Sequence, residues 1–342
     1  MDQETITKAI LSNLIDRYID EVAENPARAL RQLVDIGARI SDGHSQQIFY
    51  QMMQEMAWNQ ESPYYRMFQN LATRVDKEKI KTYGINVGYN AWNSGARNIR
   101  LLEMETGFII PWILPFDRSE SPDRLPFKEV KRLIGEGKNF SVQTILFAYS
   151  GIVDEWEDLT GLFKSFPEMT FTLLLDGSEI TDLMLDEMTG IHNLMVCLNT
   201  DDDDWQAAAG RLIQRRCLFS CFRWILNQKQ AEEVLNGEWM EELIPLMPLA
   251  AITVMGNGID PESAEKIQKL ITDARLSQKY PFMPVNLISD FQTVGEIISD
   301  NSLIIGIGND GTVYLADKLA YRSCDFSAKM LLLEDILERV KG

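Results

Sequence analysis

The chain has 342 residues, of which 45% are hydrophobic, and its 51 acidic and 33 basic residues give a formal net charge of −18. That length suits one large α/β unit with an appendage, and the acid excess disfavours binding to nucleic acid or to anionic membranes. No apolar run approaches the roughly 18 residues of a membrane span, and the polar, acidic start MDQETITKAI is unlike a signal peptide, so a cytoplasmic protein is expected.

Residues 1–80 are predicted to form an all-helical N-terminal region. Apolar residues recur at four-residue spacing from Ile6 to Val22, Pro26 begins a second helix, and two more helices are expected over 48–56 and 64–75. Met and aromatic residues, which protein interfaces favour, are dense here. They are Phe49, Tyr50, Met52, Met53, Met56, Trp58, Tyr64, Tyr65, Met67 and Phe68. The alternative use of these residues is packing against the rest of the chain.

A charged segment, DKEKIK at 76–81, follows the helical region. The alternation in YGINVGYNAW predicts a strand over 83–92, and residues 93–107 are predicted to form a helix closed by Gly107. From Gly107 onward strand-like and helix-like segments alternate, which indicates a parallel sheet with crossover helices.

Six strand and helix units predict a partial (β/α)6 TIM-like barrel over residues 81–280. The strands are expected at 109–115, 141–149, 170–175, 194–199, 218–225 and 250–255. The helices are expected at 127–135, 155–166, 181–188, 203–215, 230–243 and 261–276. Residues 281–342 are predicted to be a C-terminal extension: an extended piece at 281–290, a β-hairpin turning at Asn309-Asp310-Gly311, and a helix over 327–340.

The stretch GFIIPWILPFDRSESPDRLPF, residues 107–127, reads as a buried first strand, a polar connection and the start of a helix. It resembles the "IPW" strand of a group of radical S-adenosylmethionine (SAM) proteins. In that group the strand leads into a CxxxCxxC loop, whose thiolates hold a [4Fe-4S] cluster that binds SAM. Here the connection 118–124 has seven residues and no cysteine, whereas the motif alone spans eight.

The resemblance continues in order along the chain. LPFKEVKRLIGEGKNF is similar to the helix that begins "LSFDEL", and LLLDGSEITDLMLDEM to the "TNGTLIDEEF" strand and helix. Tyr149-Ser150-Gly151 resembles the start of the SAM-binding "YSGGEP" turn, but Ile152 and Val153 replace its second glycine and its glutamate. CLNTDDDD replaces a "SIEG" pattern, and Ala316 takes the cysteine position of "DGxVxPC". The resemblance implies a degenerate radical-SAM-like barrel without cluster or SAM contacts, and no cofactor is expected.

If the barrel keeps a ligand pocket, residues at the C-terminal ends of its strands should line it. The candidates are Asp117, Tyr149, Ser150, Asp176, Asn199, Arg223, Asn257 and Asp290. An arginine in an apolar strand needs an anionic partner, so Arg223 is either a ligand contact or an ion pair with Asp176 or Asp117. Asp117 and Asp176 are also candidates for acid–base work or cation binding.

For several other patterns we prefer a structural explanation to a functional one. Cys217 and Cys221 form a CxxxC in a strand-like segment and, like the distant Cys197 and Cys324, are expected to be core thiols and not metal ligands. Asp201 to Asp204 is expected to be a solvated helix N-terminus, and the glycines of VMGNGID a tight turn and not a phosphate cradle. His44 and His192 are single, and no nucleophile motif such as GxSxG occurs.

The favoured interpretation is a non-catalytic radical-SAM-like protein that acts as a partner or substrate-binding subunit, beside an active radical SAM enzyme or its substrate. A homo-oligomer is the other assembly considered. The alternatives are an enzyme with a non-radical reaction at the barrel mouth and an interaction scaffold that uses the helical region.

Overall fold

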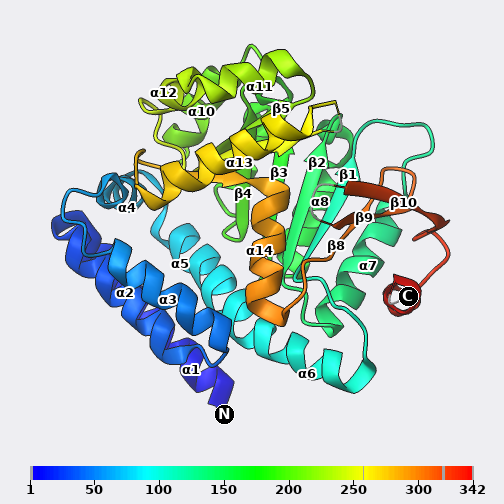
Figure 1. Ribbon diagram of the computed structural model, residues 1–342, viewed down its shortest axis with the longest axis horizontal. Coiled ribbons are helices and arrows are strands. Elements are labelled where there is room, and N and C mark those ends of the chain that lie inside the picture. Colours follow the sequence, from blue (N-terminus) through cyan, green and yellow to red (C-terminus); the bar gives the residue numbers. More distant parts are fainter. Residues whose placement is uncertain (1–2, 257, 318–319, 341–342) are drawn as a thin grey trace.

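The computed structural model describes residues 3–256, 258–317 and 320–340, and its strands form one ten-stranded sheet that is mostly parallel (Figure 1). The order is β10-β9-β8-β1-β2-β3-β4-β5-β6-β7. The strands are β1 (Ile113–Arg118), β2 (Thr144–Tyr149), β3 (Thr170–Leu175), β4 (Leu194–Asn199), β5 (Phe219–Ile225), β6 (Ala250–Met255), β7 (Met283–Asn286), β8 (Ile304–Ile307), β9 (Thr312–Asp317) and β10 (Ala320–Ser327).

Each of β1 to β6 pairs in parallel with the next strand, so β1 to β7 are successive neighbours and their C-terminal ends lie along one edge. β8 joins the other side of β1, also in parallel, through the register Phe116↔Ile307. β8 and β9 form the predicted antiparallel hairpin, in which Gly311 has φ +86°. β10 then pairs antiparallel with β9.

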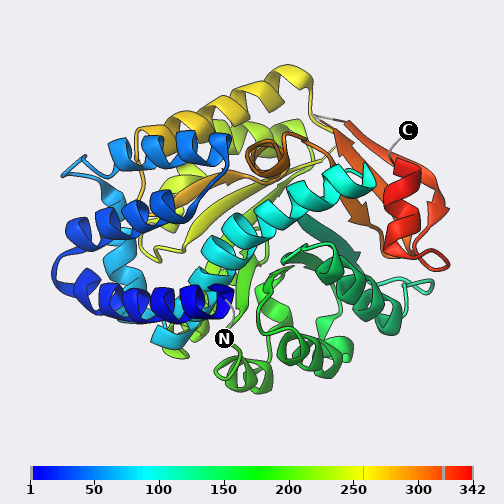
Figure 2. The same cartoon turned by 90° about the horizontal axis from the view of Figure 1, so that it is seen from below.

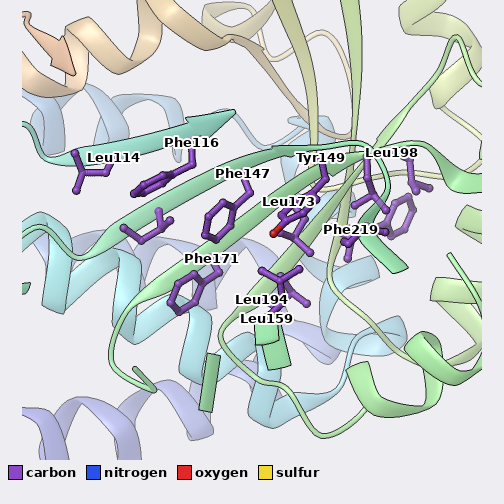
Figure 3. Packing of buried hydrophobic residues seen from close by; sticks show 14 of the residues in the cluster. Leu114, Phe116, Phe147, Tyr149, Leu159, Phe171, Leu173, Leu194, Leu198 and Phe219 are labelled. Carbon is purple, nitrogen blue, oxygen red and sulfur yellow. The ribbon is translucent and has the colours of Figure 1, made fainter. Parts of the chain in front are cut away.

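Most helices after β1 cover one face of the sheet, here called the outer face. They are α7 (Phe127–Asn139), α8 (Trp156–Ser165), α9 (Asp182–Met188), α10 (Trp205–Gln214), α11 (Gln228–Leu235), α12 (Glu238–Leu243), α13 (Pro261–Leu276) and α15 (Leu333–Val340). Two short 3₁₀ turns, η2 (Ile152–Glu155) and η3 (Gly177–Glu179), precede α8 and α9. Phe116, Phe147 and Phe171 pack on the outer face, each at most 1% exposed (Figure 3). Burying each phenyl ring contributes roughly 1.5–3 kcal/mol.

The inner face carries a second apolar cluster built by the alternate residues of the same strands, including Ile113, Leu146, Leu174 and Phe222. α14 (Leu287–Ser299) lies across this face, in front of the strands in Figure 1. Its Phe291 ring packs edge-on against Trp112, whose indole nitrogen donates to the Phe291 carbonyl. The inner face of the sheet is therefore partly covered by the helix that directly follows β7.

The N-terminal part is helical as predicted. It comprises α1 (Gln3–Glu24), α2 (Pro26–Ile40), α3 (His44–Met56), α4 (Pro63–Arg74), α5 (Lys77–Ile85), the π-helix η1 (Asn86–Gly95) and α6 (Ala96–Thr106). α1 to α3 lie side by side at one end of the molecule, away from β8 to β10 (Figure 2). Among the described residues no helix is long and apolar enough to cross a bilayer.

The strand predicted over 83–92 is wrong, because that segment is α5 and η1. The Asn86 amide donates to the Pro167 and Met169 carbonyls, and the Asn90 amide donates to the Asn86 side chain and the Glu168 carbonyl. Such i, i+4 asparagines share one helical face and satisfy backbone groups that precede β3. This polar spacing, rather than the apparent alternation, was the informative signal.

Several predicted boundaries also need correction. The first strand is Ile113–Arg118 and not 109–115, because Pro111 lacks a ladder N–H. The helix expected at 230–243 is two helices, since Gly237 has φ +85° and separates α11 from α12. The helix expected at 327–340 starts at Leu333, and β10 precedes it. The piece expected to be extended over 281–290 ends with β7 at Asn286, because α14 begins at Leu287. α14 had no predicted counterpart, although its apolar residues recur at helical spacing.

Candidate functional site

A pocket of about 670 Å³ opens at the C-terminal ends of the strands, within the size range of small-molecule sites. Its floor is the inner face of the sheet, with Leu146, Leu174 and Val254 from the strands and Leu287 from α14. Gly306, Gly308 and Tyr314 of the β8–β9 hairpin form a further side. The pocket therefore has an apolar base and walls contributed by the start, middle and end of the sheet.

Five of the eight predicted site residues line this pocket. Asp117 is the second-last residue of β1, Tyr149 and Asn199 end β2 and β4, and Ser150 and Asp176 directly follow β2 and β3. By the alternation along each strand, Asp117, Asp176 and Asn199 share the inner face with Ile113, Leu174 and Cys197. Strand-end position together with period-two alternation accounts for this convergence.

The polar rim is ordered by short hydrogen bonds. The Asn199 amide donates to an Asp176 carboxylate oxygen at 2.8 Å, and the Ser119 backbone N–H donates to Asp117 at 2.8 Å. The Ser150 hydroxyl accepts from the Glu120 backbone N–H at 2.8 Å. Each contact holds its side chain at the pocket edge, so the rim is pre-organised.

Tyr149 directs its hydroxyl away from the inner face. It donates to Glu155 at 2.8 Å, and Glu155 also forms an ion pair with Arg118, which is only 1% exposed. Burial, and then the Glu155 charge, raise the pKa of the Tyr149 phenol well above its ordinary value. This cluster of Arg118, Tyr149 and Glu155 stabilises the strand ends from the outer side.

Arg223 is not at the pocket, and its predicted pairing with Asp176 or Asp117 is wrong. Its guanidinium pairs with Asp201 at 2.8 Å and with Glu233 of α11 at 2.6 Å. The residues on either side of it, Phe222 and Trp224, face the inner side, so alternation sends Arg223 outward.

Two other candidates do not join the pocket lining. Asp290 lies in the first turn of α14, where it pairs with Arg275 at 2.8 Å and accepts from the Asn286 backbone N–H. Asn257 lies outside the described residues. Its neighbour Gly256 lines the pocket, and a Cβ at Gly258 would lie 2.3 Å from the Leu226 carbonyl oxygen, consistent with the tight turn expected there.

Sequence reasoning missed the pocket walls supplied by Trp224, Tyr314 and the start of α14. Trp224 follows the same alternation as Phe222, so its inward direction was available from the sequence. The position of Tyr314 depends on β8 pairing with β1, a contact between segments about 190 residues apart that no local pattern reveals.

The connection after β1 is held down by Arg124. Its guanidinium donates to the carbonyls of Arg118 at 2.8 Å, Ser119 at 3.1 Å and Ser150 at 2.6 Å. The Asn309 side chain donates to the Ser119 hydroxyl from the β8–β9 turn. The loop is thus closed over the ends of β1 and β2 by an arginine that satisfies three carbonyl groups.

The residues at this edge do not fit a [4Fe-4S] cluster, which requires thiolate ligands. The connection 119–126 reads SESPDRLP, and none of the four cysteines is among the described residues that line the pocket. Cys197, Cys217 and Cys221 are buried, as expected for core thiols, and burial raises the pKa of each. No group of three or more His, Cys, Asp or Glu in the described ranges is placed to hold a metal ion.

The acidic run at 201–204 has more partners within the protein than a solvated helix N-terminus. Asp201 pairs with Arg223, and Asp202 accepts the Ser178 backbone N–H at 3.0 Å. Asp204 is the N-cap residue of α10 and makes no side-chain capping hydrogen bond, but its carboxylate pairs with Arg211 at 4.0 Å. Three of the four aspartates therefore have a structural partner.

The chain matches no protein-family model, and no curated protein is significantly similar to it. Two solved structures of Streptococcus suis SuiB resemble its fold. SuiB bound to S-adenosylmethionine superimposes with a TM-score of 0.50 at 11% identity, over 71% of this chain and 67% of SuiB. SuiB bound to precursor peptide SuiA gives 0.51 at 10% identity, over 71% and 68%. The chain therefore has a radical-SAM-like fold.

Proposed function

We propose that this chain is a radical-SAM-like protein without a [4Fe-4S] cluster, and that it acts as a non-catalytic partner or substrate-binding subunit. In this proposal the units from β1 to β6 are a partial (β/α)6 barrel within residues 81–280, residues 281–342 extend it, and residues 1–80 face a partner protein.

The observation that carries the proposal is the connection between β1 and α7. A cluster-binding loop presents three thiolates, whereas residues 119–126 offer hydroxyl, carboxylate and carbonyl oxygens, which are poor ligands for an iron–sulfur cluster. Arg124 already occupies the carbonyls at the ends of β1 and β2. Both the ligand chemistry and the closed loop disfavour a cluster at this edge.

The SAM-binding turn of the resemblance is also altered. Ile152 is fully buried in the outer core, and its backbone N–H donates to the Glu179 carboxylate at 2.9 Å. Val153 is 55% exposed and has no group that accepts an ammonium hydrogen bond. The pocket beside this turn is open and has a rim ordered by hydrogen bonds. Both features serve the binding of a ligand without radical chemistry.

A protein or peptide partner is supported by two observations. Ile48, Met52 and Trp58 of the N-terminal region are 53%, 39% and 68% exposed, which leaves apolar surface uncovered by the rest of the chain. SuiB, whose fold is similar, has been solved with the precursor peptide SuiA bound. Other aromatic residues of the region are used internally: Tyr64 and Tyr65 are buried, and Phe49 packs against Trp92.

Anaerobic reconstitution with iron and sulfide tests the central claim. We expect no stoichiometric cluster, measured as iron and sulfide content and as the visible absorption of the desalted protein. A protein with CxxxCxxC, treated in parallel, is the positive control. About four irons per chain with a broad absorption shoulder would contradict the proposal.

Light scattering of the purified protein, alone and with a co-expressed neighbouring gene product, tests the role as a partner. A stable complex that requires Ile48, Met52 and Trp58 is the expected result. Polar substitution of these three exposed residues should abolish the complex while leaving the melting temperature within about 2 °C, because none of the three is buried. A strict monomer with every tested neighbour is the contrary outcome.

A further inference from the structure

We infer that the pocket selects an amphipathic cation: a primary ammonium group carried on an apolar chain. The inference rests on the proposed function, because it assigns a ligand class to the same pocket. It follows from the charges on the rim, the apolar floor and the aromatic walls, each of which is set by a different part of the chain.

The rim is acidic and has no compensating base in the pocket. Asp117 and Asp176 are the charged residues in the lining, and no Lys, Arg or His of the described chain lines it. Neither carboxylate forms an ion pair with another described residue within 4.0 Å. The two carboxylates line the pocket without a counter-ion from the described part of the protein, and they attract a cation and repel an anion.

The surrounding loops strengthen this potential. The three connections after β2, β3 and β4, residues 150–155, 176–181 and 200–204, hold eight acidic residues and no Lys, Arg or His. Three of these eight, Glu155, Asp201 and Asp204, pair with Arg118, Arg223 and Arg211. The other five, which include the rim residue Asp176, add negative charge at the strand-end edge.

The geometry of the two carboxylates favours a monovalent head group over a chelated metal ion. Asp117 lies near the end of β1 and Asp176 directly follows β3, with β2 between them, so roughly 10 Å separates the two strands. Among the described residues, no group of three or more His, Cys, Asp or Glu is placed to hold a metal ion here. An ammonium group needs only one carboxylate and nearby hydroxyl or carbonyl acceptors, such as the Ser150 hydroxyl between them.

The pocket also accommodates an apolar chain and attracts its cationic end. Leu146, Leu174, Val254 and Leu287 provide a hydrocarbon surface below the rim, and Trp224 and Tyr314 present aromatic rings, which attract cations. The N-terminal end of α14 reaches this floor, but its first-turn Asp290 accepts the Asn286 N–H, so the helix end is already supplied with an anion.

An ammonium group on an apolar chain can come from two kinds of molecule: a free alkyl amine, or the side chain of a lysine in a peptide. Both present a butyl or longer chain that ends in an ammonium group. The test therefore uses hexylammonium, hexan-1-ol and hexanoate as matched free probes, which differ in the charge of the head group. The peptide probes are Nα-acetyl-lysine amide and the same lysine flanked by two leucines. Binding is measured by calorimetry and by the change in tryptophan fluorescence. The part of that change that is lost in the Trp224→Phe variant reports on the pocket.

We expect hexylammonium to bind at least tenfold more tightly than hexan-1-ol, hexanoate not to bind, and the preference to fall as salt is raised. Asp117→Asn and Asp176→Asn should each weaken hexylammonium three- to tenfold and leave hexan-1-ol unchanged. Asp154→Asn is the matched control, since this exposed acid follows β2 but does not line the pocket. Tighter binding of the leucine-flanked lysine than of hexylammonium identifies a peptide source, and the reverse identifies a free amine.

Equal binding of hexan-1-ol, preference for hexanoate, or an effect of Asp154→Asn as large as that of the rim variants overturns the inference. So does the absence of binding by every probe at 10 mM in a protein whose melting curve is normal, a ceiling that corresponds to about 3 kcal/mol of binding free energy. These outcomes do not contradict the proposed function, because that proposal is tested by the iron and sulfide content of the reconstituted protein, which is measured separately.

Discussion

The side-chain amide of Asn199 donates a 2.8 Å hydrogen bond to the carboxylate of Asp176, across the C-terminal ends of the adjacent strands β4 and β3. The contact fixes one oxygen of Asp176, a residue of the pocket lining. It is therefore a positioning contact for the residue that we assign to an ammonium head group.

Asn199→Ala should weaken hexylammonium binding about threefold, because the Asp176 side chain loses its orientation while keeping its charge. Asn199→Gln, whose longer side chain keeps the amide donor, should recover part of the loss. Calorimetric affinities of the three proteins provide the measurement, and melting temperatures within about 2 °C of one another show that the fold is kept. Unchanged affinity in Asn199→Ala would remove the positioning role.

Arg124→Ala should loosen the connection between β1 and α7, because three carbonyls lose their donor at once. We expect faster amide hydrogen exchange confined to residues 119–126 and a stability loss of about 2 kcal/mol. Lys128→Ala on the exposed side of α7 is the control and should change neither. If exchange in the loop stays at the wild-type rate, Arg124 does not close it.

Arg223→Met should cost about 2–3 kcal/mol of stability, because Asp201 and Glu233 lose their shared partner. The substitution should leave probe binding in the pocket unchanged, since the side chain lies on the outer face. Chemical denaturation and calorimetry measure the two effects, with Arg97→Met on the exposed surface of α6 as the control. Loss of binding without loss of stability would return Arg223 to the site.

Glu103 should make the protein less stable as pH rises. Burial raises the pKa of this carboxyl to about 7, even though it accepts the Ile110 backbone N–H at 2.9 Å and the Asn301 amide at 3.1 Å. Between its ordinary value of 4.5 and about 7 the folded state binds more protons than the unfolded state, so stability falls across this window.

Glu103→Gln keeps the acceptor oxygen and removes the titration, so it should reduce the drop in melting temperature between pH 5 and pH 8 by a few degrees. Glu105→Gln, an exposed acid on the same helix, should leave the drop as it is in the wild type. Calorimetric melts at the two pH values compare the three proteins. Identical drops in all three would show that Glu103 does not titrate in this range.

SAM should bind very weakly, with a dissociation constant above about 1 mM by calorimetry, or less than about 4 kcal/mol of binding free energy. Ile152 adds side-chain bulk at a turn that carries glycine in the resembling proteins, and its N–H is already bonded to Glu179. SAM is itself an amphipathic cation, so hexylammonium is the comparison that separates head-group attraction from recognition of the whole molecule. Micromolar SAM affinity would contradict the degenerate interpretation.

Local patterns predicted the strands best where burial on both faces left long apolar runs, as at β3, β4 and β6, whose bounds agree residue for residue. They failed at 83–92, where buried asparagines satisfy carbonyls before β3, and at β10, which exists through its pairing with β9. Asp117, Asp176 and Asn199 were found because strand ends converge. The prediction that Arg223 lies at the pocket is wrong because neighbouring residues of a strand point to opposite faces, and Phe222 and Trp224 point to the inner face.

The pairing of β8 with β1 has a consequence for the newly made chain. Phe116 leaves the ribosome about 190 residues before its partner Ile307, which at about 5–20 residues per second is a delay of roughly 10–40 seconds. During that time one side of β1 is an open strand edge with unpaired N–H and C=O groups, the kind of edge through which nascent chains associate. Chaperone dependence during synthesis should therefore decline only when residues 304–307 have emerged.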